Sequence, residues 1–138
     1  MKRPASLLFV FLAFSAQPLA APEDFAGTFK GTDQNEVHSC SIAGYNGAST
    51  DPWTVTHEVS GAAYTGKGRN AHGEFTVEGK ISGNTATGVY SGVNRLNVPW
   101  QGEFTATLEG DTLKFAGKGS VGGGSGCKFL SEVTAKKS

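Results

Sequence analysis

The feature that most constrains this chain is a strict two-residue alternation between Trp100 and Gly119. From residue 100 to residue 109, every even position is apolar or small and every odd position is polar or charged. This period is typical of a β-strand with one buried face and one face in water. Gly110 and Asp111 tolerate positive φ, so the chain can turn back tightly into a second run that ends at Gly119. The stretch therefore predicts a β-hairpin.

The same pattern recurs along the rest of the chain after residue 21. It predicts strands at residues 25–31, 53–59, 64–68, 73–82, 85–91, 100–109, 112–119 and 127–135. No stretch in this part has the apolar period of a helix. The chain is therefore predicted to be all-β, a single antiparallel meander of about eight strands.

Residues 1–21 have the features of a secretory signal peptide. Lys2 and Arg3 precede an apolar run from Leu7 to Phe14, and small residues follow up to Ala21. The apolar run is shorter than the roughly 20 residues that span a bilayer. We therefore expect an exported protein, periplasmic or extracellular, in which residues 22–138 form one β-barrel domain without a membrane span.

The charge of the exported part argues against nucleic-acid binding. The chain has 12 Lys and Arg, and removal of Lys2 and Arg3 leaves 10 against 12 Asp and Glu, a net charge near −2. The basic residues are scattered, whereas a phosphate-binding surface needs them clustered. We expect no nucleic-acid partner.

The two cysteines, Cys40 and Cys127, are predicted to form a disulfide. Two cysteines in an exported chain pair most simply with each other, and the sequence has neither a Cys-x-x-Cys motif nor a metal-ligand spacing. If residues 38–42 formed a full strand, the barrel would have nine strands and the cysteines would tend toward opposite ends. If residues 32–52 are an excursion across one end, eight strands bring the cysteines within the roughly 7 Å that a disulfide needs between Cα atoms. Eight strands fit better.

Connection lengths predict a barrel whose two ends differ. The reversals at residues 60–61, 83–84 and 110–111 are tight, whereas the connections 32–52, 69–73, 92–99 and 121–126 are longer. Alternate connections of an up-and-down meander lie at the same end, so one end is pinched and the other is open. Glycines alternate with aromatics on the inward faces. They either relieve crowding around the rings or leave a pocket between aromatic walls.

No group of residues has the spacing of a catalytic site. His57 is inward by alternation and is interpreted as a hydrogen-bonded core residue, and His72 is interpreted as a solvated loop residue. His38 has no acidic partner at a spacing that would indicate a catalytic pair. The strand glutamates fall on outer faces, so no carboxylate pair is arranged for acid–base chemistry. We expect a protein that is not an enzyme and that uses no cofactor or metal.

The open end is the predicted binding site. Trp53 and Trp100 are each expected to begin a strand there and to point inward. The surrounding loops supply four further candidates: Tyr45, Arg69, His72 and Arg95. Aromatic walls with a few polar groups suit a small apolar or aromatic ligand. The simpler interpretation is that the two Trp residues plug the barrel mouth and the loops are ordinary connections.

Two other functions fit the same pattern. The polar loops could instead contact a protein partner, as a hydrolase inhibitor does. A small outer-membrane barrel also has eight alternating strands, with aromatics facing lipid, but it needs aromatic girdles at both interfaces that are missing here. We expect a monomeric binding module as the first choice.

Several short phrases resemble the calycin-type secreted barrels, the lipocalin-like and avidin-like proteins. Phe25-Ala-Gly-Thr-Phe-Lys stands where such barrels carry a Gly-x-Trp motif, with Phe29 in place of the Trp. Ala63–Gly66 and Trp100–Gly102 are similar to avidin strand phrases. The resemblance implies the barrel fold. Avidins place several Trp around biotin, whereas the later strands here hold Tyr and Phe, so no binding residue is transferred.

Overall fold

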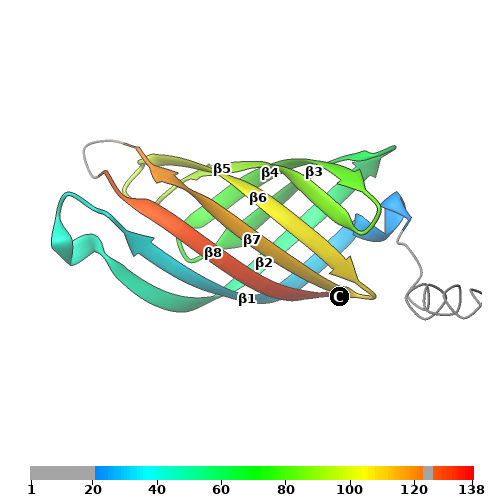
Figure 1. Ribbon diagram of the computed structural model, residues 1–138, viewed down its shortest axis with the longest axis horizontal. Helices are drawn as coiled ribbons and strands as arrows, with labels where there is room; N and C mark the ends of the chain where they lie inside the picture. Colours follow the sequence, from blue (N-terminus) through cyan, green and yellow to red (C-terminus); the bar gives the residue numbers. More distant parts are fainter. Residues whose placement is uncertain (1–20, 123–125) are drawn as a thin grey trace, which may run out of the picture.

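The chain forms a closed antiparallel β-barrel, described by a computed structural model over residues 21–122 and 126–138 (Figure 1). Its eight strands are β1 (Gly27–His38), β2 (Gly47–Ser60), β3 (Ala63–Asn70), β4 (Gly73–Ser82), β5 (Thr85–Val93), β6 (Pro99–Glu109), β7 (Thr112–Val121) and β8 (Lys128–Lys137). Each strand pairs with its sequence neighbours, and β1 also pairs with β8. The predicted fold class is therefore confirmed. The predicted signal peptide, residues 1–21, lies outside the described residues except for Ala21.

The alternation in the sequence sorts side chains into an interior and an exterior. Every strand places at least one aromatic or aliphatic residue in the buried core. The outer faces carry Thr, Glu and Lys, with exposed ion pairs such as Lys114–Glu109 at 3.8 Å. A membrane barrel needs the reverse, with aromatics outside and polar residues within. The buried aromatic side chains thus face the barrel interior, whereas the outer-membrane alternative predicts that they face outward. No helix among the described residues has the length and apolar character needed to cross a membrane.

The pinched end is closed by a short 3₁₀ turn, η1 (Pro22–Phe25), next to the C-terminus (Figure 1). Phe25 was predicted to begin the first strand, but it belongs to this turn and is fully buried. Pro22 suits the first position of such a turn, and the backbone N–H of Ala21 donates to Asp24 Oδ2 at 2.9 Å. The turn thereby places the Phe25 ring as a plug in the pinched end.

The open end differs from the prediction, because β1 and β2 extend well beyond the expected strands. They pair from Gly27↔His57 to Val37↔Gly47, so the predicted excursion 32–52 is wrong and the true loop is residues 39–46. β1 also pairs with β8 up to His38↔Lys128, and these two ladders satisfy the backbone polar groups of the extension. The β3–β4 connection, predicted to be long, is a tight turn at residues 71–72.

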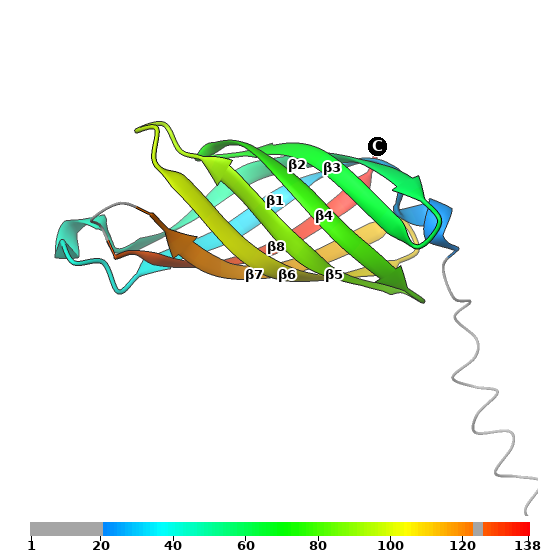
Figure 2. The same cartoon turned by 90° about the horizontal axis from the view of Figure 1, so that it is seen from above.

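The longer loops nevertheless gather at one end of the barrel. Figure 2 shows the β1–β2 loop and the β5–β6 loop projecting at the end opposite η1. The β5–β6 loop comprises residues 94–98, between β5 and β6. The prediction of one pinched end and one open end therefore holds for three of the four connections.

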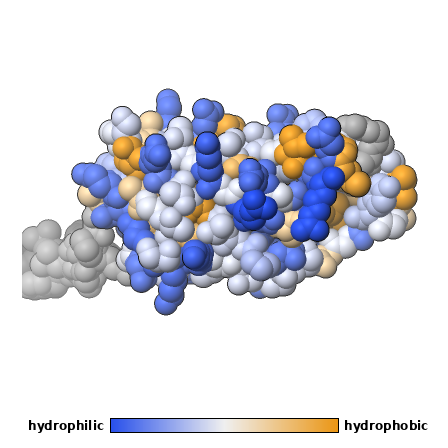
Figure 3. All heavy atoms as spheres, turned by 180° about the vertical axis from the view of Figure 1, so that it is seen from behind, coloured by the Kyte–Doolittle hydropathy of each residue, from blue (hydrophilic) through white to orange (hydrophobic). Residues whose placement is uncertain are grey.

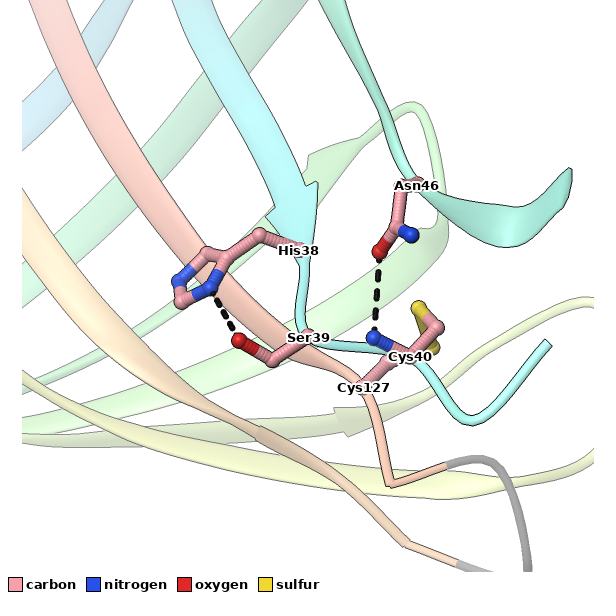
Figure 4. The surroundings of a disulfide bond; sticks show 5 residues. All are labelled: His38, Ser39, Cys40, Asn46 and Cys127. Carbon is pink, nitrogen blue, oxygen red and sulfur yellow. Dashed lines mark hydrogen bonds between the residues drawn. A yellow bond between two sulfur atoms is a disulfide. The ribbon is translucent and has the colours of Figure 1, made fainter. Parts of the chain in front are cut away.

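A disulfide joins Cys40 to Cys127 at the open end, as predicted (Figure 4). It ties the β1–β2 loop to the segment just before β8. The backbone N–H of Cys40 donates to the side-chain Oδ1 of Asn46 at 3.0 Å, which bridges the two ends of that loop. The loop is therefore held to the barrel rim by a covalent bond and a hydrogen bond.

Inward-facing glycines let large rings cross the barrel interior. A Cβ atom added to Gly79 would lie 2.6 Å from Cε1 of Tyr64, closer than atoms can pack. Gly117 is similarly covered by the ring and hydroxyl of Tyr90. Tyr90 packs edge-on against Phe104 and Phe115, with ring centroids 6.0 and 5.1 Å away. The interpretation that glycine relieves crowding is confirmed at these positions.

Candidate functional site

A cavity of about 500 Å³ occupies the open end of the barrel. Its walls come from β1, β5, β6, β7 and β8 and from the loops above them, and they are largely apolar: Val37, Val98, Trp100, Val121 and Phe129. Trp100 and Phe129 pack edge-on with centroids 5.5 Å apart, and both are buried. The apolar walls are therefore built by strand residues that also belong to the core.

The rim of the cavity carries exposed hydrophobic side chains. Ile42 and Tyr45 of the β1–β2 loop are 55% and 56% exposed, and Leu96 of the β5–β6 loop is 78% exposed. The side-chain Oδ1 of Asn94 accepts backbone N–H bonds from Leu96 at 2.9 Å and Val98 at 3.0 Å, which orders that loop. Figure 3 shows mostly polar residues along one side of the barrel, with hydrophobic residues gathered toward the open end.

The floor of the cavity is polar, in contrast to its walls. Asn35 and Ser131 line it, and Nδ2 of Asn35 donates to Oγ of Ser131 at 3.1 Å across the β1–β8 seam. The hydroxyl of Tyr90 reaches the same region from β5 and lies beside the side chain of Ser131, without a hydrogen bond of good geometry. Burial raises the pKa of this hydroxyl above its ordinary value. The floor therefore offers amide and hydroxyl groups to whatever enters the cavity.

Asp33 lies one inward position from Asn35 on β1, next to the polar floor. It is 2% exposed, and its Oδ1 makes no hydrogen bond. Burial raises the pKa of its carboxyl to about 6, and the neighbouring Asp51 carboxylate acts in the same direction. Asn35 and Ser131 oppose this shift by hydrogen bonding to the charged form. The barrel interior thus holds a buried carboxyl group beside the polar side chains of Asn35 and Ser131.

Three of the predicted site residues line the cavity. Trp100, near the start of β6, forms part of the wall and is 7% exposed. Tyr45 lines it from the short 3₁₀ turn η2 (Ala43–Tyr45). His72 lines it from the β3–β4 turn, where its backbone N–H donates to Asn70 Oδ1 at 2.9 Å. The structure brings these three side chains to one site.

The other three predicted residues lie elsewhere. The expectation that Trp53 begins a strand at the mouth is wrong, because β2 begins at Gly47 and Trp53 stacks on Phe75 deep in the core at 5.8 Å. Arg69 is on the outer face, where Nη2 pairs with Glu74 Oε2 at 2.6 Å. Arg95 is exposed on the β5–β6 loop and is not part of the cavity wall.

Asp33 and Asn35 were missed because the predicted first strand was ended too early. Asp33, Asn35 and Val37 continue the inward positions set by Phe29 and Gly31. The polar character of two of them suggested a loop. The unbroken two-residue spacing was the signal that could have placed them inside the barrel.

His57 is a core residue of the pinched end, as interpreted from its alternation. It is 4% exposed, and its Nδ1 donates to the carbonyl of Phe25 at 2.9 Å. Burial lowers its pKa to about 4, so the ring is neutral near pH 7. Within residues 21–122 and 126–138, no group of three or more His, Cys, Asp or Glu is placed to hold a metal ion.

The fold and the cavity together define the class of protein: a closed, disulfide-linked, eight-stranded up-and-down barrel with a mostly apolar cavity at one end. No protein-family model matches the sequence, and no curated protein is similar to it. What the protein does must therefore be inferred from the cavity itself.

Proposed function

We propose that this protein is a non-enzymatic binding module that holds a small apolar or aromatic-bearing ligand in the open-end cavity. The observation that carries the proposal is the cavity of about 500 Å³ with apolar walls and a polar floor. Small-molecule sites have volumes of roughly 300–1,000 Å³ and combine apolar walls with a few polar groups that orient the ligand. Trp100 and Phe129 would contact the ligand body, while Asn35 and Ser131 would meet its polar end.

The proposal includes export to the periplasm or the extracellular space and a monomeric state. Disulfides such as Cys40–Cys127 are typical of proteins in oxidising compartments. Kinship with the calycin-type barrels is proposed on the short sequence phrases around Phe29 and Trp100, and the up-and-down barrel is compatible with it.

The test is binding of N-phenyl-1-naphthylamine, a probe that is uncharged near pH 7 and fluoresces in apolar surroundings. We expect saturable enhancement with one site per chain. Val121→Phe places an aromatic ring in the cavity wall in place of a smaller side chain. The ring fills part of the cavity, so it should weaken binding of the probe at least about tenfold. Val89→Phe is the matched control, because Val89 is 53% exposed on the outer face of β5. Equal affinity of both variants, or absence of saturable binding, would refute the proposal.

A protein-binding role, for example as a hydrolase inhibitor, is a second candidate. The observation that favours it is the exposure of Leu96, Ile42 and Tyr45 on the rim, because large exposed apolar side chains anchor protein interfaces. A purified partner should then bind with defined stoichiometry, and Leu96→Asp or Arg95→Glu should abolish this binding. Retention of the same partner by both variants would exclude the rim as the contact surface.

A further inference from the structure

The inner wall beside the cavity floor carries two carboxyl groups that face each other across neighbouring strands. Asp33 on β1 and Asp51 on β2 are partners in the strand register. Asp51 shares the inward side of β2 with Trp53 by alternation, and Ser49 Oγ donates to it at 2.7 Å. The ion pairs of the described residues, Arg69–Glu74 and Lys114–Glu109, include neither carboxylate. The negative charge on this wall is therefore not neutralised by a described Lys or Arg side chain.

Polar atoms around the floor also lack hydrogen-bond partners. Within the described part of the chain, three buried side-chain atoms make no hydrogen bond: Oδ1 of Asp33, the hydroxyl of Tyr90 and Nε1 of Trp100. Tyr90 is 3% exposed, Trp100 is 7% exposed, and both line the cavity. Buried polar groups are nearly always paired in native proteins, and an unpaired one calls for an explanation. Tyr90 and Trp100 line the cavity and Asp33 lies beside its floor, so a polar group of a ligand would complete this site.

The charge of the site selects the kind of polar group. An anion at the floor would be repelled by Asp33 and Asp51, and a neutral group could donate a hydrogen bond to a carboxylate but would lack the attraction between opposite charges. An ammonium group would be attracted by both carboxylates. It would also lie in a cavity lined by the aromatic rings of Tyr90, Trp100 and Phe129. Aromatic rings attract cations through their π faces.

Building on the proposed function, we propose that the cavity selects amphiphilic amines. The protonated amine sits at the polar floor with Asp33 as its counter-ion, and an alkyl or aromatic tail lies against the apolar walls. Asp33 is suited to this role because its carboxyl interacts with Asn35 and Ser131, which line the floor. Asp51, less buried and farther along the open end, adds to the attraction.

The proposal predicts a dependence on pH. The titratable groups that face Asp33 are Asp51 from β2 and Tyr90 from β5, while β8 contributes the uncharged Ser131 and Val133. Burial raises the pKa of Asp33 to about 6, so the free protein carries a proton there at pH 5 and has lost it at pH 7.5. The preference for an amine should therefore be strong at pH 7.5 and weak at pH 5.

The experiment compares octylamine, 1-octanol and octanoate by isothermal titration calorimetry at pH 7.5. We expect octylamine to bind at least about tenfold more tightly than 1-octanol, because only the ammonium gains the attraction between opposite charges. Octanoate should bind most weakly. Asp33→Asn should remove most of the preference for octylamine over 1-octanol, with a smaller remainder due to Asp51, and should leave the affinity for 1-octanol unchanged. Glu36→Gln is the matched control, because Glu36 is exposed on the outer face of the same strand, and it should keep the preference.

The outcomes separate this inference from the function on which it rests. Binding of 1-octanol as tight as that of octylamine, in the wild-type protein, overturns the amine selectivity and leaves the apolar binding module standing. Tighter binding of octanoate overturns it as well. Failure of all three ligands and of N-phenyl-1-naphthylamine overturns both proposals. A preference for octylamine that Asp33→Asn leaves undiminished excludes Asp33 as the counter-ion.

Discussion

Replacing Asp33 with asparagine should change how the stability of the barrel depends on pH. The carboxyl is 2% exposed, and its pKa is raised from 3.8 to about 6, chiefly by burial. The folded state therefore holds this proton more tightly than the unfolded chain does. The associated stability is fully present below pH 3.8 and is lost as the pH rises through about 6. Asparagine has nearly the same shape and no charge, so Asp33→Asn removes this loss.

The magnitude follows from the size of the pKa difference. At about 1.4 kcal/mol for each pH unit, the shift corresponds to about 3 kcal/mol between pH 4 and pH 7. Water that reaches the carboxyl from the cavity screens it and makes this an upper value. His57 acts in the opposite direction, because its pKa is lowered from 6.5 to about 4. The contribution of His57 to the stability of the folded protein is fully present above pH 6.5 and is lost as the pH falls through about 4. Its size is similar to that of Asp33.

The pH ranges over which Asp33 and His57 change the stability overlap. Their contributions to the pH dependence therefore nearly cancel in the wild-type protein. Its free energy of unfolding should change little between pH 4 and pH 6.5 on their account. In Asp33→Asn only the His57 contribution remains, so stability should rise by about 3 kcal/mol over this range. At pH 7.5 the variant should exceed the wild type by up to about 3 kcal/mol, whereas at pH 4 the two should be nearly equal.

The assay is urea unfolding at pH 4, 5, 6, 7 and 8 with the disulfide intact, followed by tryptophan fluorescence. Glu36→Gln removes one carboxylate from the outer face of the same strand and serves as the control, with a profile parallel to that of the wild type. A variant that is less stable than the wild type at pH 7.5 would refute the reasoning. So would a difference between the two proteins that stays constant with pH.

Three further predictions concern packing, the disulfide and the unpaired tyrosine. Gly79→Ala should destabilise the barrel by about 1–3 kcal/mol because its Cβ meets a ring, whereas Gly47→Ala, in open space, should not lower the urea midpoint. Alkylation without reduction should leave Cys40 and Cys127 unmodified, and labelled thiols would contradict this. Replacing both with serine should lower the free energy of unfolding by up to about 4–5 kcal/mol, because the bond joins residues 87 apart. An unchanged urea midpoint would contradict that expectation. Tyr90→Phe removes a buried hydroxyl that has no hydrogen bond, so it should stabilise the ligand-free protein by about 1 kcal/mol, and a lower melting temperature would argue against it.

Local patterns in the sequence were sufficient to predict the barrel fold. The two-residue alternation around Phe104 and Phe115 fixes which side chains are buried, since a strand presents successive residues to opposite faces. Tight turns such as Gly110-Asp111 define where strands reverse. A disulfide requires Cys40 and Cys127 to lie at the same end of the barrel, which favoured eight strands over nine, and the structure has eight strands and this disulfide. The alternation and the turns depend on neighbours in the chain, and the cysteine pairing depends on there being two cysteines, so all three can be recognised without tertiary information.

The candidate site depended on contacts that the chain order does not reveal. Trp100 was correctly placed at the cavity, but Trp53 was not, because the length of β2 is set by its pairing with β1 rather than by its own apolar residues. Asp33 appeared to be a loop residue, since a polar side chain on an inward position contradicts the usual pattern of a strand. Hydrogen bonding of β1 to both β2 and β8 carries it into the interior. Only the closed barrel brings it beside Asn35 and Ser131, and that placement determines the charge of the cavity floor.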